Sequence, residues 1–178
     1  MKKIILLSLI AIGFVGMYSC KKLDELTKFN LEYKSSVTVP ANSIVNLPLN
    51  LPTPDITTNS KNSFENNNTN KDLVQEIKLD KMNITVKAPQ GTNLDFLKSV
   101  EVYISAEGLD EVRVASKFDI ADGLTSLDLD YADINLKDYV LKESIKLRVK
   151  TITDKAVTED RDLDILTRFW VNAKILGV

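Results

Sequence analysis

The sequence predicts an all-β protein, an antiparallel β-sandwich of seven to nine strands with one short helix. Three observations support this prediction. Beyond residue 28, apolar and polar residues alternate with a period of two in one segment after another. A helical spacing of apolar residues occurs in a single short segment. Short strands of this kind over about 150 residues are typical of two packed sheets, with a small β-barrel as the alternative.

The first two predicted strands lie before residue 54. "KFNLEYKSSVTVP" directs alternate apolar side chains to one face, which are Phe29, Leu31, Tyr33, Val37 and Val39. "NLPLNLPTP" does the same with Leu47, Leu49 and Leu51. Because proline has no N–H to donate to a neighbouring strand, the prolines of this second segment predict an edge strand.

The middle of the chain predicts a kinked strand followed by a hairpin. In "QEIKLDKMNITVKAP" the alternation changes phase, which predicts a bulge near Asp80 and Lys81. The apolar residues on either side of the change are Ile77, Leu79, Met82, Ile84 and Val86. In the hairpin we expect Val100, Val102 and Ile104 to point inward, a turn from Glu107 to Asp110, and a return through Val112 and Val114.

The last third of the chain predicts one short strand, the helix and two long strands. "LTSLDLDY" alternates through Leu127 and Leu129, and "NLKDYVLKE" has the helical spacing of Leu136, Tyr139 and Val140. The inward positions of the two final strands are Ile145, Leu147, Val149, Leu163, Ile165, Phe169, Val171 and Ala173. The whole pattern resembles that of immunoglobulin-like and late-embryogenesis-abundant-type sandwiches.

One segment interrupts the alternation. Residues 53–72 contain six asparagines and a single aromatic residue, Phe64. A polar segment of this length predicts a long surface loop. It is either a flexible low-complexity insertion or a loop presented to a partner.

The amino-terminal residues have the pattern of an export signal. Lys2 and Lys3 precede an uncharged apolar run of fourteen residues from Ile4 to Met17. This run has the length of a signal-peptide core and is shorter than the roughly 20 residues that span a bilayer as a helix. It ends shortly before Cys20, the only cysteine of the chain.

Ser19 followed by Cys20 at the end of the apolar run resembles the lipobox of bacterial lipoproteins, in the looser form of Bacteroidota-type lipoproteins. Met17 and Tyr18 stand where the stricter pattern has other residues. The resemblance implies a signal peptide at 1–19, acyl chains such as palmitate attached at Cys20, and membrane attachment through that lipid. It also implies an outer-membrane location, since Lys21 follows the cysteine. Residues 20–28 would then be a tether and 29–178 a single domain, facing either the periplasm or the cell surface.

Composition limits the chemistry of the mature chain. Without Lys2 and Lys3, 21 basic residues stand against 25 acidic ones, so no nucleic-acid partner is expected. The chain has no histidine, which removes the commonest general base and the His-containing nucleophile and zinc systems. We therefore expect no enzyme activity, no cofactor and no metal.

Three sets of residues are candidate sites. Clustered acids that could bind calcium or form a carboxylate-based hydrolase pair are Glu159, Asp160, Asp162 and Asp164, and then Asp128, Asp130 and Asp133. Aromatic residues that could stack on sugars are Tyr103, Tyr131, Tyr139 and Trp170. The alternative interpretation of the acids is that they are the solvent-facing residues of an amphipathic strand.

The sequence thus predicts a lipid-anchored envelope protein that acts as a non-catalytic binding or structural module. An envelope protein, an extracellular protein or a glycan is the expected partner. The alternatives are a carbohydrate- or calcium-dependent binding module and, third, a carboxylate-based hydrolase.

Overall fold

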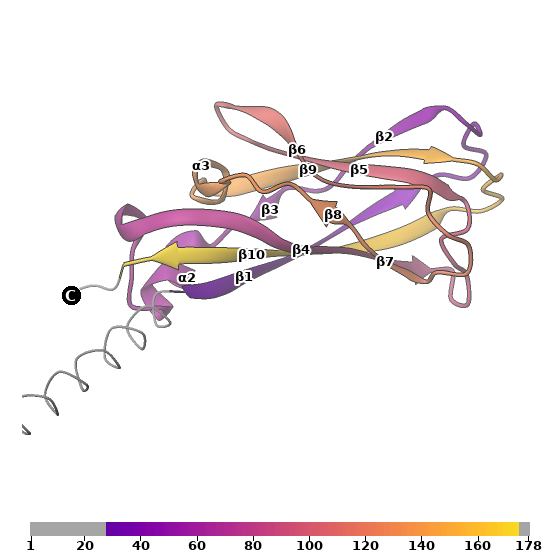
Figure 1. The fold of residues 1–178 in the computed structure, drawn as a ribbon. Helices are drawn as coiled ribbons and strands as arrows, with labels where there is room; N and C mark the ends of the chain where they lie inside the picture. Colours follow the sequence, from indigo (N-terminus) through magenta and orange to yellow (C-terminus); the bar gives the residue numbers. More distant parts are fainter. Residues whose placement is uncertain (1–27, 175–178) are drawn as a thin grey trace, which may run out of the picture.

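The strands form two antiparallel sheets that face each other in a computed structural model, which describes residues 28–174 (Figure 1). The four-stranded sheet has the order β1 (Lys28–Val39), β10 (Arg161–Ala173), β4 (Val74–Ala88) and β7 (Ser126–Asp128). The six-stranded sheet has the order β2 (Pro48–Pro52), β9 (Ser144–Thr153), β5 (Leu97–Ala106), β6 (Leu109–Phe118) and β8 (Asp130–Tyr131), with β3 (Ile56–Thr57) also paired to β9.

This arrangement confirms the predicted antiparallel β-sandwich. The alternative of a small barrel is wrong, because each sheet is open, with β1 and β7 at the edges of one and β2 and β8 at the edges of the other. Because the two sheets pack face to face, alternate residues of each strand point into the interface and the others point to solvent.

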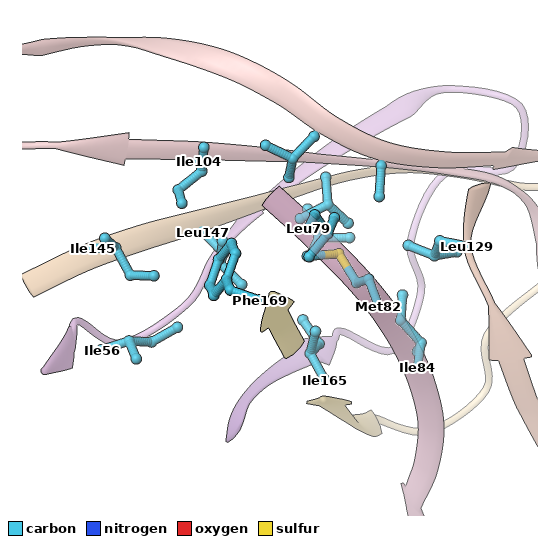
Figure 2. Packing of buried hydrophobic residues seen from close by; sticks show 14 of the residues in the cluster. Ile56, Leu79, Met82, Ile84, Ile104, Leu129, Ile145, Leu147, Ile165 and Phe169 are labelled. Carbon is cyan, nitrogen blue, oxygen red and sulfur yellow. The ribbon is translucent and has the colours of Figure 1, made fainter. Parts of the chain in front are cut away.

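The core between the sheets consists mainly of aliphatic side chains. Figure 2 shows Leu79, Met82 and Ile84 of β4 in this layer, with Ile145 and Leu147 of β9. All the predicted inward residues of the last two strands are buried: Ile145, Leu147, Val149, Leu163, Ile165, Phe169, Val171 and Ala173. Burying a side chain of this size stabilises the fold by about 1.5–3 kcal/mol relative to leaving it exposed.

Strand β4 contains the predicted bulge. Leu79 lies opposite Phe169 and Lys81 lies opposite Arg168, so Asp80 has no partner of its own on β10. Leu79 and Met82 are both buried. They are three residues apart and would point to opposite faces of a regular strand, so the extra residue keeps both halves of β4 facing the core.

The predicted edge strand and hairpin are also present. β2 ends the six-stranded sheet, with a proline at each end of the strand. β5 and β6 form the hairpin, with Val100, Val102, Ile104 and Val114 buried. The turn is shorter than predicted, because only Glu107 and Gly108 lie outside the two strands and Gly108 adopts a φ of 72°.

The described residues contain ten strands rather than seven to nine, partly because one predicted strand is two. Ser126–Asp128 pairs with β4 in one sheet, and Asp130–Tyr131 pairs with β6 in the other. The chain crosses between the sheets at Leu129, which is buried and whose N–H donates to the Met82 carbonyl. Alternation alone cannot show such a crossing, because both halves keep the same phase.

Residues 53–72 do not form the predicted long loop. They contain β3, a helix α2 (Ser60–Asn66) and the start of a 3₁₀ turn η1 (Lys71–Leu73). Phe64 of α2 is buried and meets Phe29 of β1 edge to face at 6.1 Å. The segment is ordered because this one aromatic residue anchors it and because buried threonines, such as Thr58 and Thr69, bond to backbone carbonyls elsewhere.

The predicted short helix is present as α3 (Lys137–Val140), so α2 is a second one. Within residues 28–174, no helix has the length and apolar character needed to cross a bilayer. The predicted signal peptide and Cys20 lie outside the described residues, so both stay predictions.

Replacing Phe64 with alanine tests whether this residue holds α2 in place. Phe64→Ala should lower the free energy of unfolding by about 3–5 kcal/mol, the cost of removing a buried phenylalanine. It should also make residues 53–72 sensitive to limited proteolysis. The control is Asn66→Ala, at an exposed site of the same helix, and its free energy of unfolding in urea should change by less than about 1 kcal/mol. An equal loss of free energy in both variants would contradict the anchoring role of Phe64.

Candidate binding groove

A polar groove of about 500 Å³ lies at one end of the sandwich. It is bounded by α2, by η1 and by the turn after α3. Its lining residues are Ser60, Lys61, Glu65, Asn70, Lys71, Asp72, Leu141 and Glu143. A second hollow of about 270 Å³ shares the lining residues Ser60, Lys61 and Glu143 with it.

Hydrogen bonds from Thr58 and Tyr33 fix the groove walls to the sheets. Thr58 donates its N–H to the Glu143 carbonyl at 3.0 Å and its hydroxyl to the Lys142 carbonyl at 2.6 Å. The hydroxyl of Tyr33 on β1 donates to the Thr58 carbonyl at 2.8 Å. Burial raises the pKa of Tyr33 to about 12, so this hydroxyl keeps its proton and its bond at physiological pH.

The η1 wall of the groove is fixed in the same way. The side-chain oxygen of Asn70 accepts the N–H groups of Asp72 and Leu73, which caps η1. The Thr69 hydroxyl donates to the Lys174 carbonyl, and the Lys174 N–H donates to the Leu73 carbonyl. The groove therefore has a preformed backbone frame.

Five charged side chains of both signs line the groove. They are Lys61, Glu65, Lys71, Asp72 and Glu143, and all five are exposed. Among the interactions of residues 28–174, none of the five side chains forms an ion pair or a side-chain hydrogen bond. Two cationic and three anionic groups are therefore free to bond to a ligand.

On the outer face of the six-stranded sheet, in contrast to the groove, charged side chains are bonded to one another. Glu101 of β5 accepts from Lys150 of β9 at 2.8 Å, from Arg113 of β6 at 2.9 Å and from the Tyr103 hydroxyl at 3.0 Å. The guanidinium of Arg148 lies 4.3 Å from the centre of the Tyr103 ring. The opposite charges of this network are paired across three strands. They therefore stabilise the sheet and are not available to a ligand.

The network shifts the titration of its carboxylates. Hydrogen bonds from Lys150 and then Arg113 lower the pKa of Glu101 to about 2, and its side chain is only 14% exposed. The hydrogen bond from Arg148 likewise lowers the pKa of Glu111, the carboxylate on β6 that Arg148 bonds with its Nε atom. Both groups stay ionised well into acidic solution.

The acidic residues from 159 to 164 do not converge. Glu159 pairs with Arg161, Asp160 accepts from the Ala41 N–H, Asp162 accepts from the Thr38 hydroxyl, and Asp164 pairs with Lys87. Their carboxylates therefore serve four separate contacts. No three or more acidic or cysteine side chains within residues 28–174 are grouped so as to hold a metal ion.

The second acidic set is divided between the two sheets. Asp128 on β7 accepts from Asn83 at 2.8 Å, whereas Asp130 on β8 pairs with Lys117 at 3.1 Å. Asp133 pairs with Lys78 of β4 at 2.9 Å. The crossing of the chain between the sheets separates these carboxylates.

The candidate aromatic residues also lie apart. Phe169 is buried, so the next residue, Trp170, lies half-buried on the outer face of the four-stranded sheet. Tyr103 is on the opposite outer face, under Arg148, and the Tyr139 hydroxyl bonds to the Asp110 carbonyl. Tyr131 is 50% exposed and borders a hollow of about 260 Å³.

Sequence patterns did not indicate the groove. Its walls come from residues 60–72 and 141–143, which are far apart in the chain and meet because Thr58 bonds across to Lys142 and Glu143. The one available signal was the length of the polar segment 53–72, which is consistent with a functional loop.

Comparison with known proteins identifies no family for the chain. Neither a protein-family model nor a curated protein sequence matches it. N-glycanase F is similar over 85% of this chain with 13% identity and a TM-score of 0.41, and the match spans 43% of that enzyme. This chain thus covers less than half the length of that protein.

Two further solved structures are similar at the same level. CpGH89CBM32-5 from Clostridium perfringens, solved in complex with GalNAc-β-1,3-galactose, matches over 80% of this chain and 97% of its own, with 10% identity and a TM-score of 0.37. The decameric BFDV capsid protein matches over 83% and 98%, with 6% identity and a TM-score of 0.41. At these values the likeness carries no argument about function.

Two substitutions test whether Glu101 is a paired charge and Glu143 an unpaired one. Glu101→Gln should lower the free energy of unfolding at pH 7 by about 1–3 kcal/mol, because it leaves two cations without their carboxylate. Glu143→Gln should change it by less than about 0.5 kcal/mol, because Glu143 has no partner to lose. Urea unfolding measures the free energy of unfolding of both variants. A large loss of stability in Glu143→Gln would contradict the assignment of Glu143 as an unpaired charge.

The pH dependence of the Glu101 effect has a definite sign. Because the folded-state pKa is lowered from 4.5 to about 2, the stability gained from ionised Glu101 is present above about pH 4.5 and disappears as the pH falls to about 2. The difference in free energy of unfolding between wild type and Glu101→Gln should therefore be constant from pH 7 to 5 and shrink below pH 4.5. A difference that stays constant down to pH 2 would be inconsistent with the network.

Proposed function

We propose that this chain is a lipoprotein of the bacterial outer membrane, anchored through Cys20, that binds a partner in its polar groove without catalysing a reaction. The observation that carries the binding role is the set of five unpaired charges around one preformed groove. Elsewhere on the two outer faces, many charges are bonded to each other, as in the Glu101 network and in the Arg168–Asp80 pair.

The chemistry of the groove favours a partner that carries charges of both signs. Lys61 and Lys71 can donate to carboxylates, while Glu65, Asp72 and Glu143 can accept from ammonium or guanidinium groups. A segment of another protein with mixed charges supplies both kinds of group, whereas a neutral glycan supplies neither. We therefore propose an envelope protein as the partner.

The anchor would keep the groove close to the membrane. Residues 21–27 lie between Cys20 and the first residue of β1, and seven residues reach at most about 25 Å. The start of β1 is beside α2, because Phe29 packs against Phe64. A partner in the groove would therefore be a protein whose binding segment lies near the same membrane surface.

The groove suits binding better than hydrolysis. A carboxylate-based hydrolase needs one acid withdrawn from water so that it stays protonated as the general acid. The three acids of the groove, Glu65, Asp72 and Glu143, are all exposed. The sequence also lacks histidine as an alternative general base.

Carbohydrate binding is the second candidate, and the hollow beside Tyr131 favours it. Tyr131 lines it together with charged groups of both signs, among them Arg168 and Asp80. An exposed aromatic ring beside hydrogen-bonding groups fits a sugar ring. Its volume of about 260 Å³ suits a single ring.

The anchor is tested by Cys20→Ala. Wild type should incorporate labelled palmitate and sediment with outer membranes, whereas the variant should do neither. Protease added to intact cells then separates the two orientations, because only a surface-exposed domain is digested. Equal mass, labelling and location of the two proteins would disprove lipidation at Cys20.

The groove is tested by photo-crosslinking in cells. A photoreactive amino acid at position 143 should form a discrete adduct with a membrane-associated protein, and the same probe at Gln90, an exposed residue outside the groove, should not. The double change Lys61→Glu and Lys71→Glu should abolish the adduct by reversing both positive charges. Identical adducts from both probes, or an adduct that survives the double change, would rule out the groove as the binding site.

A further inference from the structure

Strand β1 leaves one long edge of the four-stranded sheet open. Its twelve residues pair with β10 on one side only. On the other side, no backbone N–H or carbonyl of residues 29–39 bonds to another backbone group within the described chain. The other edge strands are much shorter, with three residues in β7, five in β2 and two in β8.

β1 lacks most of the features that prevent edge strands from pairing with another chain. It contains no proline, and its register with β10 runs without a bulge from Lys28 to Val39. Edge strands that stay unpaired are usually short, bulged or interrupted by proline, or they carry charges. Only the charges are present here, so their arrangement decides what the edge can accept.

Two of these charges have no partner among the described residues. Glu32 and Lys34 are exposed on the outer face of β1, and neither forms an ion pair with a described residue. Arg168 lies opposite Glu32 on β10 but bonds to Asp80 at 2.6 Å, on the other side of β10. Leu166 lies opposite Lys34 and offers no charge.

We propose that two copies of this chain form a dimer by pairing their β1 strands edge to edge in an antiparallel sense. With the two-fold axis at Tyr33, Glu32 faces the partner's Lys34 and Lys34 faces the partner's Glu32. Both unpaired charges are then satisfied twice by symmetry. The two four-stranded sheets become one continuous sheet across the dimer.

The same charges select this register over its neighbours. Directly opposed residues share a face, so the strands can slip only by steps that keep outer residues opposite outer residues. A slip one way places Glu32 opposite the partner's Glu32, and a slip the other way places Lys34 opposite the partner's Lys34. Like charges directly opposite destabilise a strand pair, so the register centred on Tyr33 is favoured.

The pairing is compatible with two lipid anchors. Lys28 then lies opposite the partner's Thr38, so the first residues of the two β1 strands are ten residues, or about 33 Å, apart along the sheet. Tethers of about 25 Å allow both chains to reach one membrane when the strands lie along its surface. The pairing itself does not depend on the anchor.

Disulfide formation between two differently tagged full-length chains tests the register. One chain carries Glu32→Cys and the other Lys34→Cys, and both are co-expressed and oxidised mildly in isolated membranes. Directly opposed residues have Cβ atoms about 4.5–5.5 Å apart, close enough for a disulfide after small adjustments. The mixed disulfide should form several times faster than with the offset combination of Glu32→Cys and Ser36→Cys. Wild type, with Cys20 alone, gives the background, and equal yields for the matched and offset pairs would overturn the proposal.

Charge exchange provides an independent test. Analytical ultracentrifugation of the full chain in detergent should show a dimer whose dissociation constant rises roughly tenfold in Glu32→Lys, because two attractive contacts become repulsive. Adding Lys34→Glu to the same chain restores opposite charges across the axis and should restore dimerisation. A wild type that stays monomeric, or a double variant as weak as the single one, would overturn the proposal.

Discussion

The burial of aliphatic side chains between two open sheets is the interaction on which the rest of this structure depends. The chain has a single cysteine, so no disulfide within one copy can reinforce the fold. Each strand therefore has to present its apolar residues to one layer without interruption. β4 meets this requirement by means of the bulge at Asp80, which keeps Leu79 and Met82 on the same side. The outer faces, the groove and the free edge of β1 are all positioned by this layer.

Charges on the outer face of the six-stranded sheet are paired, whereas those of the groove are not. On the six-stranded sheet, Glu101 is held by Lys150 and Arg113, and its lowered pKa reflects that the ionised form is bonded in the folded state. In the groove, the charges are exposed and bond to nothing in the described chain. Unpaired charges of both signs around a fixed frame contribute little to folding and are available to a partner. Glu32 and Lys34 on the edge of β1 are likewise exposed and form no ion pair with a described residue.

The predicted inward faces of the strands hold, whereas the predictions of one strand around Leu127 and Leu129 and of a long loop at 53–72 do not. The inward faces of β9 and β10 follow from alternation, because a strand has only two faces and one of them is apolar. The strand predicted around Leu127 and Leu129 is divided between two sheets, since alternation does not say which neighbour a strand will pair with. Residues 53–72 look like a flexible polar loop in composition, yet Phe64 and two buried threonines order them. A few buried contacts can therefore order a segment whose composition is typical of a flexible loop.

The sequence by itself determined the class of the fold, the inward residues, the bulge in β4 and the edge position of β2, because these depend on local periodicity and on the missing N–H of proline. It also shows that the chain has no histidine, and folding cannot supply a residue type that the sequence lacks. Only the tertiary structure decided that the acids from 159 to 164 serve separate contacts, and that Lys61 and Glu143 border the same groove. The reason is physical. Periodicity fixes the direction of a side chain relative to its own strand, whereas its distance from a residue eighty positions away depends on how the strands are ordered and connected.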